Sequence, residues 1–414
     1  MTDRLTSLSW MVVLFVAASA LIPDMGFHSP VGTDDILPLL ATLVGSAILL
    51  LRPLPDPGPM VITLVLLVAL SICANIFVPE HLLFRALIRG PARIGMYLIF
   101  VLAFSAVVEG LDARKVLVAC GLCAVVEAAF GLGAFIFNYT GPWHGGVYFT
   151  EEPTQSLAGS GLGRIVGTFN TSNGQGMNFV SAYLMIFVPI LFALGRTTRG
   201  TARLGWYIAT ALVAAAMLAT YTRMSIVALF GGVVVALAVA GHLRLIAAAA
   251  VGGGLGLMMI PGLAQRFLDK NDRIRLYAAA WDATMDSPWL GHGDISYLEF
   301  IFELANRYHT MFGVAGSTPH NSILYAFFRY GIGGAILTAM VMVVPILYFM
   351  VQARRYDGPA RVFAWAGVAS FVSFALQAQT NNLLDIPKVT FYFFALWVAL
   401  RVVIRQTSRG GLES

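Results

Sequence analysis

Long apolar runs, separated by short charged or glycine- and proline-rich segments, dominate this chain of 414 residues. The hydrocarbon core of a bilayer is about 30 Å thick, and an α-helix needs roughly 20 mainly apolar residues to cross it. Twelve runs approach this length with their flanking residues, and their apolar centres lie at residues 8–22, 36–51, 61–78, 94–108, 116–137, 179–194, 204–219, 226–240, 245–260, 332–350, 362–376 and 389–400. The pattern predicts an all-α, polytopic integral membrane protein with about 12 transmembrane helices, in a single membrane domain spanning residues 1–414.

The composition supports this fold class and excludes several others. Apolar residues make up 58% of the chain and charged residues 11%, whereas soluble domains average about 45–50% and about 25%. The three cysteines, Cys73, Cys120 and Cys123, lie inside apolar runs, so neither a disulfide framework nor a cysteine metal cluster is expected. We expect membrane lipids around the protein, no cofactor, no bound metal and no nucleic-acid partner.

The basic residues predict the orientation of the chain. Short cytoplasmic loops are enriched in Lys and Arg, and with both termini in the cytoplasm the inner segments hold 14 basic and 6 acidic residues, leaving 12 basic and 15 acidic residues elsewhere. The outer face nevertheless keeps a group of basic residues around one long segment: Arg223, Arg266, Lys270, Arg273, Arg275, Arg307 and Arg329. A phosphate-bearing ligand would explain this group, and solvated loop charges are the simpler alternative.

Two outer segments are too long to be simple connectors. They span residues 138–178 and residues 261–331, the second lying between predicted spans 9 and 10. Long loops on a rigid scaffold commonly carry binding and catalytic residues, so we expect the catalytic loop at residues 261–331. Residues 159–164 look like a nucleotide-binding loop, but they lack its Gly-Lys-Ser/Thr ending. Arg164 remains as a candidate ligand group in the first loop.

The sharpest local signal is the sequence Ser-Thr-Pro-His-Asn-Ser-Ile-Leu at residues 317–324. Thr318 is a good N-cap and Pro319 suits the first helical position, so the pattern predicts His320 in the first turn of a helix that ends near Gly331. A helix N-terminus disfavours the imidazolium and keeps the ring neutral, as a general base requires. A histidine that only forms hydrogen bonds at the membrane surface is the alternative.

Two arginines suggest which kind of substrate group lies next to such a base. Arg223 lies at the outer end of a predicted span, where an arginine usually faces a partner or a water-filled cavity, although snorkelling would also explain it. Residues 273–293 predict a helix ended by a Pro/Gly turn, with Arg273 and Tyr277 on one face. Guanidinium groups next to a neutral base suit displacement of a diphosphate, because they neutralise the leaving group while the base takes a proton from the attacking hydroxyl.

Four motifs in a fixed order carry a resemblance to a known family. They are Arg…Gly-Thr-Phe…Asn (Arg164, Gly167, Thr168, Phe169, Asn173), an outer Thr-Arg pair (Thr222, Arg223), Arg-x-x-x-aromatic…Pro-x-x-Gly-x-Gly (Arg273, Tyr277, Pro288, Gly291, Gly293) and His-Asn-x-x-Leu…Gly (His320, Asn321, Leu324, Gly331). In these motifs the chain resembles the bacterial O-antigen ligase and polymerase superfamily of integral membrane glycosyltransferases. The family has Trp where Tyr277 stands, which leaves open whether Arg273 or Arg275 is its key arginine.

The resemblance implies a reaction and its residues. A member of the superfamily would transfer a glycan from undecaprenyl diphosphate to a sugar hydroxyl, with inversion and without an obligatory metal, at the periplasmic face of the bacterial inner membrane. The resemblance implies one base and two catalytic ligands of the diphosphate, which are His320, Arg223 and Arg273. It implies three further substrate-binding residues: Arg275, Arg164 and Asn321.

Several alternatives stay open at the level of the sequence. The acceptor is lipid A core in a ligase and a second lipid-linked glycan in an O-antigen or exopolysaccharide polymerase, and the sequence does not separate the two. A lipid-linked glycan transporter would also be apolar, although we find no paired repeats with broken helices. The mid-span Glu127 favours a transporter as a proton relay, and a buried pairing with a neighbouring helix is the simpler explanation. A metal-dependent glycosyltransferase would use the carboxylates of Asp24, Asp34 and Asp35, of which the last two also make an ordinary polar start for a span.

Overall fold

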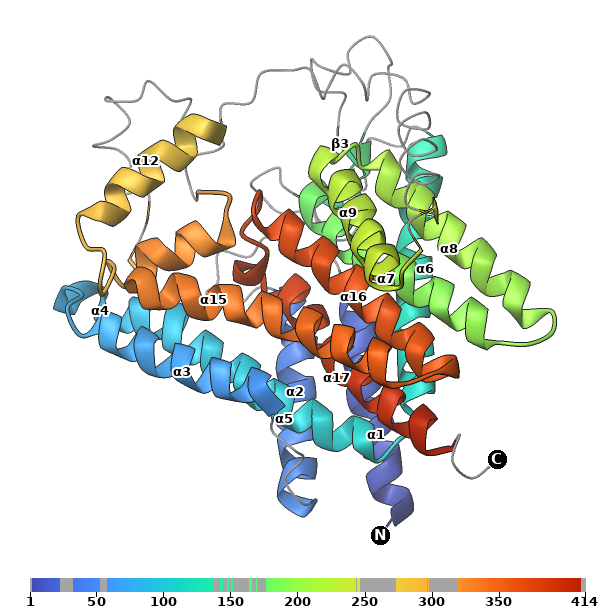
Figure 1. The fold of residues 1–414 in the computed structure, drawn as a ribbon. Helices are drawn as coiled ribbons and strands as arrows, with labels where there is room; N and C mark the ends of the chain where they lie inside the picture. Colours follow the sequence, from blue (N-terminus) through green and yellow to red (C-terminus); the bar gives the residue numbers. More distant parts are fainter. Residues whose placement is uncertain are drawn as a thin grey trace.

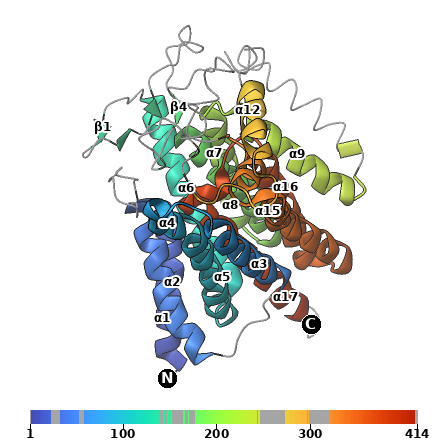
Figure 2. The ribbon, with the colours of Figure 1, turned by 90° about the vertical axis from the view of Figure 1, so that its left-hand side faces the viewer.

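The computed structural model describes residues 2–22, 33–52, 58–137, 142–143, 147–148, 150–151, 164–165, 169, 176–242, 244–245, 273–295, 297 and 319–410. This part of the chain is largely a bundle of helices (Figures 1 and 2). They are α1 (Thr2–Ser19), α2 (Thr33–Leu51), α3 (Gly58–Asn75), α4 (Glu80–Leu87), the π-helix η1 (Ile88–Ala92), α5 (Arg93–Glu109), α6 (Ala113–Ile136), α7 (Gly176–Thr197), α8 (Ala202–Ala219), α9 (Arg223–Val239), α12 (Arg273–Met285), α15 (Ser322–Arg355), α16 (Gly358–Ala378), the 3-10 helix η4 (Leu383–Asp385) and α17 (Pro387–Gly410). Strands β1 (Pro142–Trp143) and β2 (Val147–Tyr148) form one antiparallel pair, and β3 (Thr150–Glu151) and β4 (Arg164–Ile165) form another.

The helices confirm the all-α membrane fold that the apolar pattern predicts. Within the described residues, eight helical segments are long and apolar enough to cross a bilayer. Three shorter apolar helices, Leu5–Ser19, Pro38–Leu51 and Arg223–Val239, coincide with three further predicted spans. The predicted span at residues 245–260 lies outside the described residues. The protein is therefore a polytopic membrane protein with an all-α architecture.

Helix α17 forms the centre of the bundle. In α17, 94% of the membrane-crossing residues are buried, against 17% in the peripheral α8. The Tyr392 ring of α17 packs edge-on against Tyr183 of α7 at 4.7 Å between centroids, and Trp397 packs against Phe349 of α15 at 5.4 Å. Since lipid tails are as apolar as the side chains, helices in a membrane associate through close packing. Interlocking aromatic rings supply this packing at the centre.

Loops that the charge pattern assigns to the cytoplasm lie together at one end of the bundle. Arg405 of α17 pairs with Glu109 at the end of α5, with 3.4 Å between Nη2 and Oε1. Arg114, at the start of α6, donates to the carbonyl of Thr197 at the end of α7 at 3.1 Å. The start of α1 and the end of α17 lie at this end, and α12 lies at the opposite end (Figures 1 and 2). The geometry therefore agrees with a topology in which these loops share one side of the membrane.

Helix α15 is broken at Tyr330 and Gly331, which confirms the predicted end of a helix near Gly331. The backbone angles there are φ −128°, ψ 15° and φ 65°, ψ −165°, neither of which is helical. A Cβ added to Gly334 would lie 2.7 Å from the carbonyl oxygen of Ala326, although these residues are about 12 Å apart along a straight helix. The chain thus turns back on itself, and Figure 1 shows the first part of α15 beside the start of the second.

The turn at residues 288–293, which follows α12, supplies hydrogen-bond partners to the broken helix. Before the break, the N–H groups of His292 and Gly293 donate to the carbonyls of Phe328 and Arg329 at 2.8 Å each. After the break, the N–H group of Ile332 donates to the carbonyl of Pro288 at 2.9 Å. The Pro/Gly turn predicted to end α12 is confirmed. Its backbone replaces the helical hydrogen bonds that the reversal of α15 removes.

Two glycines permit this contact between backbones. Gly291 and Gly331 have positive φ angles of 70° and 65°, which residues with a side chain rarely adopt. A Cβ on Gly291 would lie 2.4 Å from the carbonyl carbon of Arg329, and a Cβ on Gly331 would lie 2.1 Å from the carbonyl oxygen of Trp289. Both motif glycines are explained by the close approach of the turn to α15.

Replacing Gly331 with Ala should destabilise the protein by about 2 kcal/mol or more, because the left-handed conformation costs a residue with a side chain about 1–2 kcal/mol and the new Cβ overlaps Trp289. Thermal unfolding of the purified protein in detergent measures the change. The matched control is Gly95→Ala in α5, where nothing lies within 4 Å of the added Cβ. Unfolding of Gly331→Ala at the wild-type temperature would contradict the described contact.

The orientation is testable by cysteine labelling in a variant whose native cysteines are replaced. Trp289 is 76% exposed at the end that carries α12, and Arg199 is exposed in the turn between α7 and α8. A membrane-impermeant maleimide should label Trp289→Cys in intact spheroplasts and Arg199→Cys only after the membrane is disrupted. The reverse pattern would invert the topology.

Candidate active site

His320 lies directly before α15 and not in its first turn. The N-cap of α15 is Asn321, whose Oδ1 accepts hydrogen bonds from the backbone N–H groups of Ile323 and Leu324 at 3.0 Å each. The prediction that His320 is helical, with Thr318 as N-cap, is therefore wrong. Asn is at least as good a cap as Thr, and the positive φ of His320 is incompatible with a helix starting before it. Thr318 lies outside the described residues.

The backbone of His320 is held in an uncommon conformation inside the protein. Its φ is 50°, and the residue is 7% exposed. A non-glycine residue with positive φ persists where the surrounding structure fixes it, and such residues cluster at functional sites. The positive end of the α15 dipole follows immediately and disfavours a second positive charge at this place.

The segment at residues 379–382, which follows α16, anchors the start of α15. Ser322, two residues after His320, donates from Oγ to the carbonyl of Asn381 at 3.1 Å. Asn381 and Asn382 are both buried, with 1% and 6% exposure. The position of His320 is thereby tied to the end of α16.

Helix α12 is tied to the same segment. The hydroxyl of Tyr277 donates to the carbonyl of Gln379 at 2.9 Å. Tyr277 lies one helical turn after Arg273, which is the first residue of α12. The side chains of Arg273 and Arg275 lie outside what the structure describes, so their roles stay predictions. The backbone of their helical turn is nevertheless placed near the end of α16.

Arg223 is partly buried as the first residue of α9, in agreement with its predicted position at the end of a span. Two residues later, the Oγ of Ser225 lies 2.6 Å from the Oγ of Ser181 on α7. Gln377, in the last turn of α16, donates from Nε2 to the same Ser181 oxygen at 3.3 Å. The start of α9 is therefore fastened to the end of α16 as well.

Three segments that carry predicted site residues are thus linked to one end of α16. The segments of His320 and Arg273 contact residues 381 and 379 directly, and the segment of Arg223 is joined to Gln377 through Ser181 of α7. Arg164 differs, because β4 packs against α6, α7 and α8 and its side chain lies outside the described part.

Phe169, from the Gly-Thr-Phe motif, covers a buried lysine. The Nζ of Lys388, at the start of α17, lies 4.0 Å from the Phe169 ring centroid and donates to the carbonyl of Ile22 at 2.9 Å. Lys388 is 1% exposed, and a desolvated cation–π contact contributes about 2 kcal/mol. The aromatic residue of this motif therefore packs the first long loop against the start of α17, and Lys388 in turn binds the segment that follows α1.

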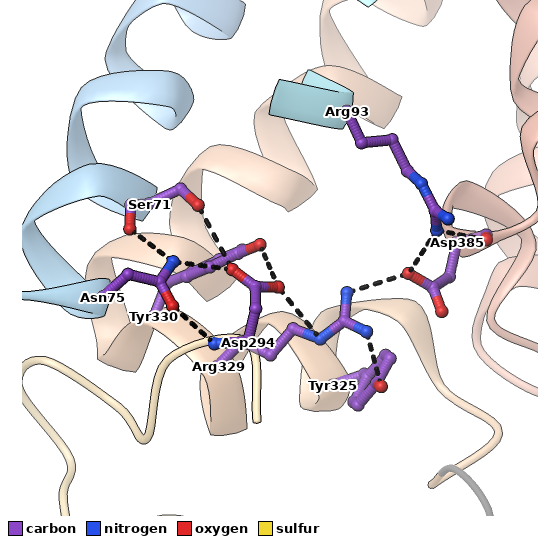
Figure 3. Close-up of polar contacts among 8 residues, drawn as sticks. All are labelled: Ser71, Asn75, Arg93, Asp294, Tyr325, Arg329, Tyr330 and Asp385. Atoms are coloured by element: carbon purple, nitrogen blue, oxygen red, sulfur yellow. Dashed lines mark hydrogen bonds and ion pairs between the residues drawn. The ribbon is translucent and has the colours of Figure 1, made fainter. Parts of the chain in front are cut away.

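Asp294 is a buried carboxylate that the sequence did not single out. It follows the glycine turn and is 3% exposed. Its carboxylate accepts hydrogen bonds from Asn75 Nδ2 and the Tyr330 hydroxyl at 2.8 Å each, and its N–H donates to Asn75 Oδ1 at 2.9 Å (Figure 3). Burial raises the pKa of Asp294, and the nearby Arg329 with these two hydrogen bonds opposes the rise. Asp294 links the turn to α3 and α15.

Arg329 joins Asp294 to a second carboxylate, Asp385 of η4. Its Nε lies 3.5 Å from Asp294 Oδ1 and its Nη1 2.8 Å from Asp385 Oδ1, while its guanidinium lies 3.8 Å from the centroid of the Tyr325 ring (Figure 3). Arg93 reaches the same Asp385 oxygen at 3.7 Å. The sequence placed Arg329 among the outer basic residues, but no local pattern marks its two partners.

A cavity of about 630 Å³, a volume that includes the space at its open mouth, lies beside this network. Its polar wall comes from η1, α5, the first part of α15 and residues 382–385, and includes Arg89, Arg93, Ser322, Tyr325, Arg329, Asn382 and Asp385. Its apolar wall comes from α3, α5, α15 and α17, and includes Leu64, Leu67, Ile94, Val341 and Phe394. Ser322 lines the cavity two residues after His320.

The residues of the two remaining alternatives are only partly described. Asp34 and Asp35 lie in the first turn of α2, but their side chains, like all of Asp24, lie outside the described part. Glu127, the proposed proton relay of a transporter, is 1% exposed within α6. Its burial agrees with a pairing inside the bundle.

Comparison with known proteins supports the resemblance for part of the chain. Residues 208–339 match the family model described as O-antigen ligase. This stretch contains Arg223, Arg273, the glycine turn, His320 and the break at Gly331. No curated protein matches the chain. The match covers about a third of the chain and supports the resemblance to the O-antigen ligase superfamily, whose members are membrane glycosyltransferases of the ligase or polymerase type.

Proposed function

We propose that the protein transfers a glycan from undecaprenyl diphosphate to a sugar hydroxyl of lipid A core, at the periplasmic face of the bacterial inner membrane and without a metal. The observation that carries this proposal is that the segments of His320, Arg223 and Arg273 are all linked to residues 377–381, the second of them through Ser181 of α7. A single-displacement glycosyl transfer needs a base and a cationic site for the leaving diphosphate next to each other, and the links among these three segments support the proposal.

His320 is the base in this proposal. Its imidazole takes the proton of the acceptor hydroxyl while the hydroxyl oxygen bonds to the anomeric carbon of the donor glycan. The bond between that carbon and the diphosphate oxygen breaks, and the electron pair leaves with undecaprenyl diphosphate. Attack opposite to the leaving group inverts the anomeric centre. The buried, backbone-constrained position of His320 suits a base, because the productive geometry has to be held before reaction.

Arg223 and Arg273 neutralise the diphosphate as charge develops on it, and Arg275 and Arg164 support them. Guanidinium groups bind phosphate oxygens in a bidentate manner and are most effective in a site from which water is excluded. Asn321 contributes by fixing the start of α15, since its Oδ1 is used by the cap. This role keeps it adjacent to the base without requiring a direct contact to substrate.

His320→Ala should lower glycan transfer by at least about 10²-fold, the lower end of what general bases contribute. The assay uses purified protein, undecaprenyl-diphosphate glycan and lipid A core in the presence of EDTA. His81→Ala is the matched control, because His81 is an exposed histidine of α4 at the same end of the protein. Full activity of His320→Ala would remove His320 from catalysis, and loss of wild-type transfer in EDTA would contradict a metal-independent reaction.

The same assay without the core acceptor separates ligase from polymerase. Growth of lipid-linked glycan chains under this condition would assign the protein as an O-antigen or exopolysaccharide polymerase. No product in either assay, from protein that is folded and binds donor, would favour a lipid-linked glycan transporter.

Arg223→Ala should lower kcat/KM for the donor by about 10²-fold or more, because removing a charge-assisted contact that strengthens in the transition state costs about 3 kcal/mol. Arg223→Lys should restore part of the loss, since it keeps the charge without the bidentate geometry. Arg199→Ala, which removes an exposed arginine at the opposite end, is the control. Equal activity of Arg223→Ala and wild type would place the diphosphate elsewhere.

A further inference from the structure

The cavity beside Arg329 carries more positive charge than its carboxylates balance. Arg329 is neutralised by its contacts with Asp294 and Asp385, and Arg93 shares the same Asp385. Arg89, on the π-helix η1, lines the cavity, and no ion pair joins it to a carboxylate among the described residues. Electrostatic repulsion acts on Arg89 from Arg85, Arg329 and Arg93. A bound anion would relieve this repulsion.

A buried amide in the same wall has no hydrogen-bond partner. Asn382 is 6% exposed and lines the cavity, and both its Nδ2 and its Oδ1 lack a partner among the described residues. An unsatisfied buried polar group costs about 1–3 kcal/mol, so such a group usually has a function in the bound state. An amide that can donate and accept suits a sugar hydroxyl or a phosphate oxygen.

Another part of the cavity lining is apolar. Leu64 and Leu67 of α3, Ile94 of α5 and Phe394 of α17 line it, and all four belong to membrane-crossing segments. A ligand that fits both walls has an anionic, hydroxyl-bearing head and a hydrocarbon chain. Phosphorylated glycolipids have this chemistry.

We propose that this cavity is the binding site for the phosphorylated lipid acceptor, with Arg89 and Arg93 on its phosphate, Asn382 on its sugar and the apolar wall along its hydrocarbon chain. The assignment rests on the proposed function, which reserves Arg223 and Arg273 for the donor. Those residues belong to α9 and α12, whereas the cavity is formed by α3, η1, α5, α15, η4 and α17. Two lipid-anchored substrates thus approach from different helices.

The location of Ser322 supports a productive arrangement of the two substrates. Ser322 both lines the cavity and fixes the start of α15 through the carbonyl of Asn381. His320 is two residues away. A sugar hydroxyl held by Asn382 therefore lies beside the contact between Asn381 and Ser322, which fixes the segment that carries the base.

Equilibrium binding to the full chain in detergent tests the site, with diphosphoryl lipid A and undecaprenyl diphosphate as the two probes. Arg89→Ala should weaken binding of lipid A at least about tenfold, the lower range for a lost charge-assisted contact, and leave undecaprenyl diphosphate within about twofold. Arg89→Lys should retain most of the affinity. Arg85→Ala is the charge-matched control, because Arg85 is exposed one helical turn earlier and does not line the cavity.

Three results would overturn the assignment. Loss of undecaprenyl diphosphate but not lipid A in Arg89→Ala would make the cavity part of the donor site. Unchanged binding of both probes would exclude a phosphate site at Arg89. Equal losses in Arg85→Ala and Arg89→Ala would show a general effect of surface charge.

Asn382→Ala gives a second, independent measurement. It should weaken lipid A binding while leaving the unfolding temperature unchanged or higher, because it removes an unsatisfied buried group. Unchanged lipid A binding would exclude Asn382 from the site. The His320→Ala protein should bind both probes normally but be defective in glycan transfer. If the wild-type protein transfers no glycan but binds lipid A in an Arg89-dependent way, the result counts against the proposed reaction alone.

Discussion

The exchange of backbone hydrogen bonds between residues 288–293 and the break in α15 is the contact on which the outer end of the protein depends. A backbone group without a partner at membrane depth costs several kcal/mol, so a helix can reverse there only where another segment replaces its hydrogen bonds. The glycine turn does this with three main-chain bonds. Because Gly291 and Gly331 bear no side chain, the two backbones come close enough to form them.

The same contact explains how the polar network arises. The turn delivers Asp294 to the end of α3, where its carboxylate meets Asn75 and Tyr330. Arg329, directly before the break, then reaches back to Asp294 and across to Asp385 (Figure 3). Charges in such surroundings are tolerated only when they are paired and hydrogen-bonded. The network therefore fixes the first part of α15, which His320 precedes.

The arginines in this region differ in whether carboxylates of the protein neutralise their charge. Arg329 is held by two carboxylates and an aromatic ring, so its charge serves the fold. Arg89 lies on a cavity wall among like charges, so its charge is available to a ligand. A protein that brings two anionic lipids together needs positive charge that its own carboxylates do not consume.

The sequence by itself determined the membrane fold, the span positions in the described part and the helix break at Gly331. These depend on local requirements: about 20 apolar residues for each crossing, and glycine or proline where the backbone turns. It also indicated His320 and Arg223 as chemically unusual residues. The tertiary structure alone decided that Asn321 caps α15, that His320 stands outside the helix, and that Asp294 and Asp385 share Arg329. Such pairings join residues far apart in the chain, and the hydrogen-bond partners that select them exist only once the helices have packed.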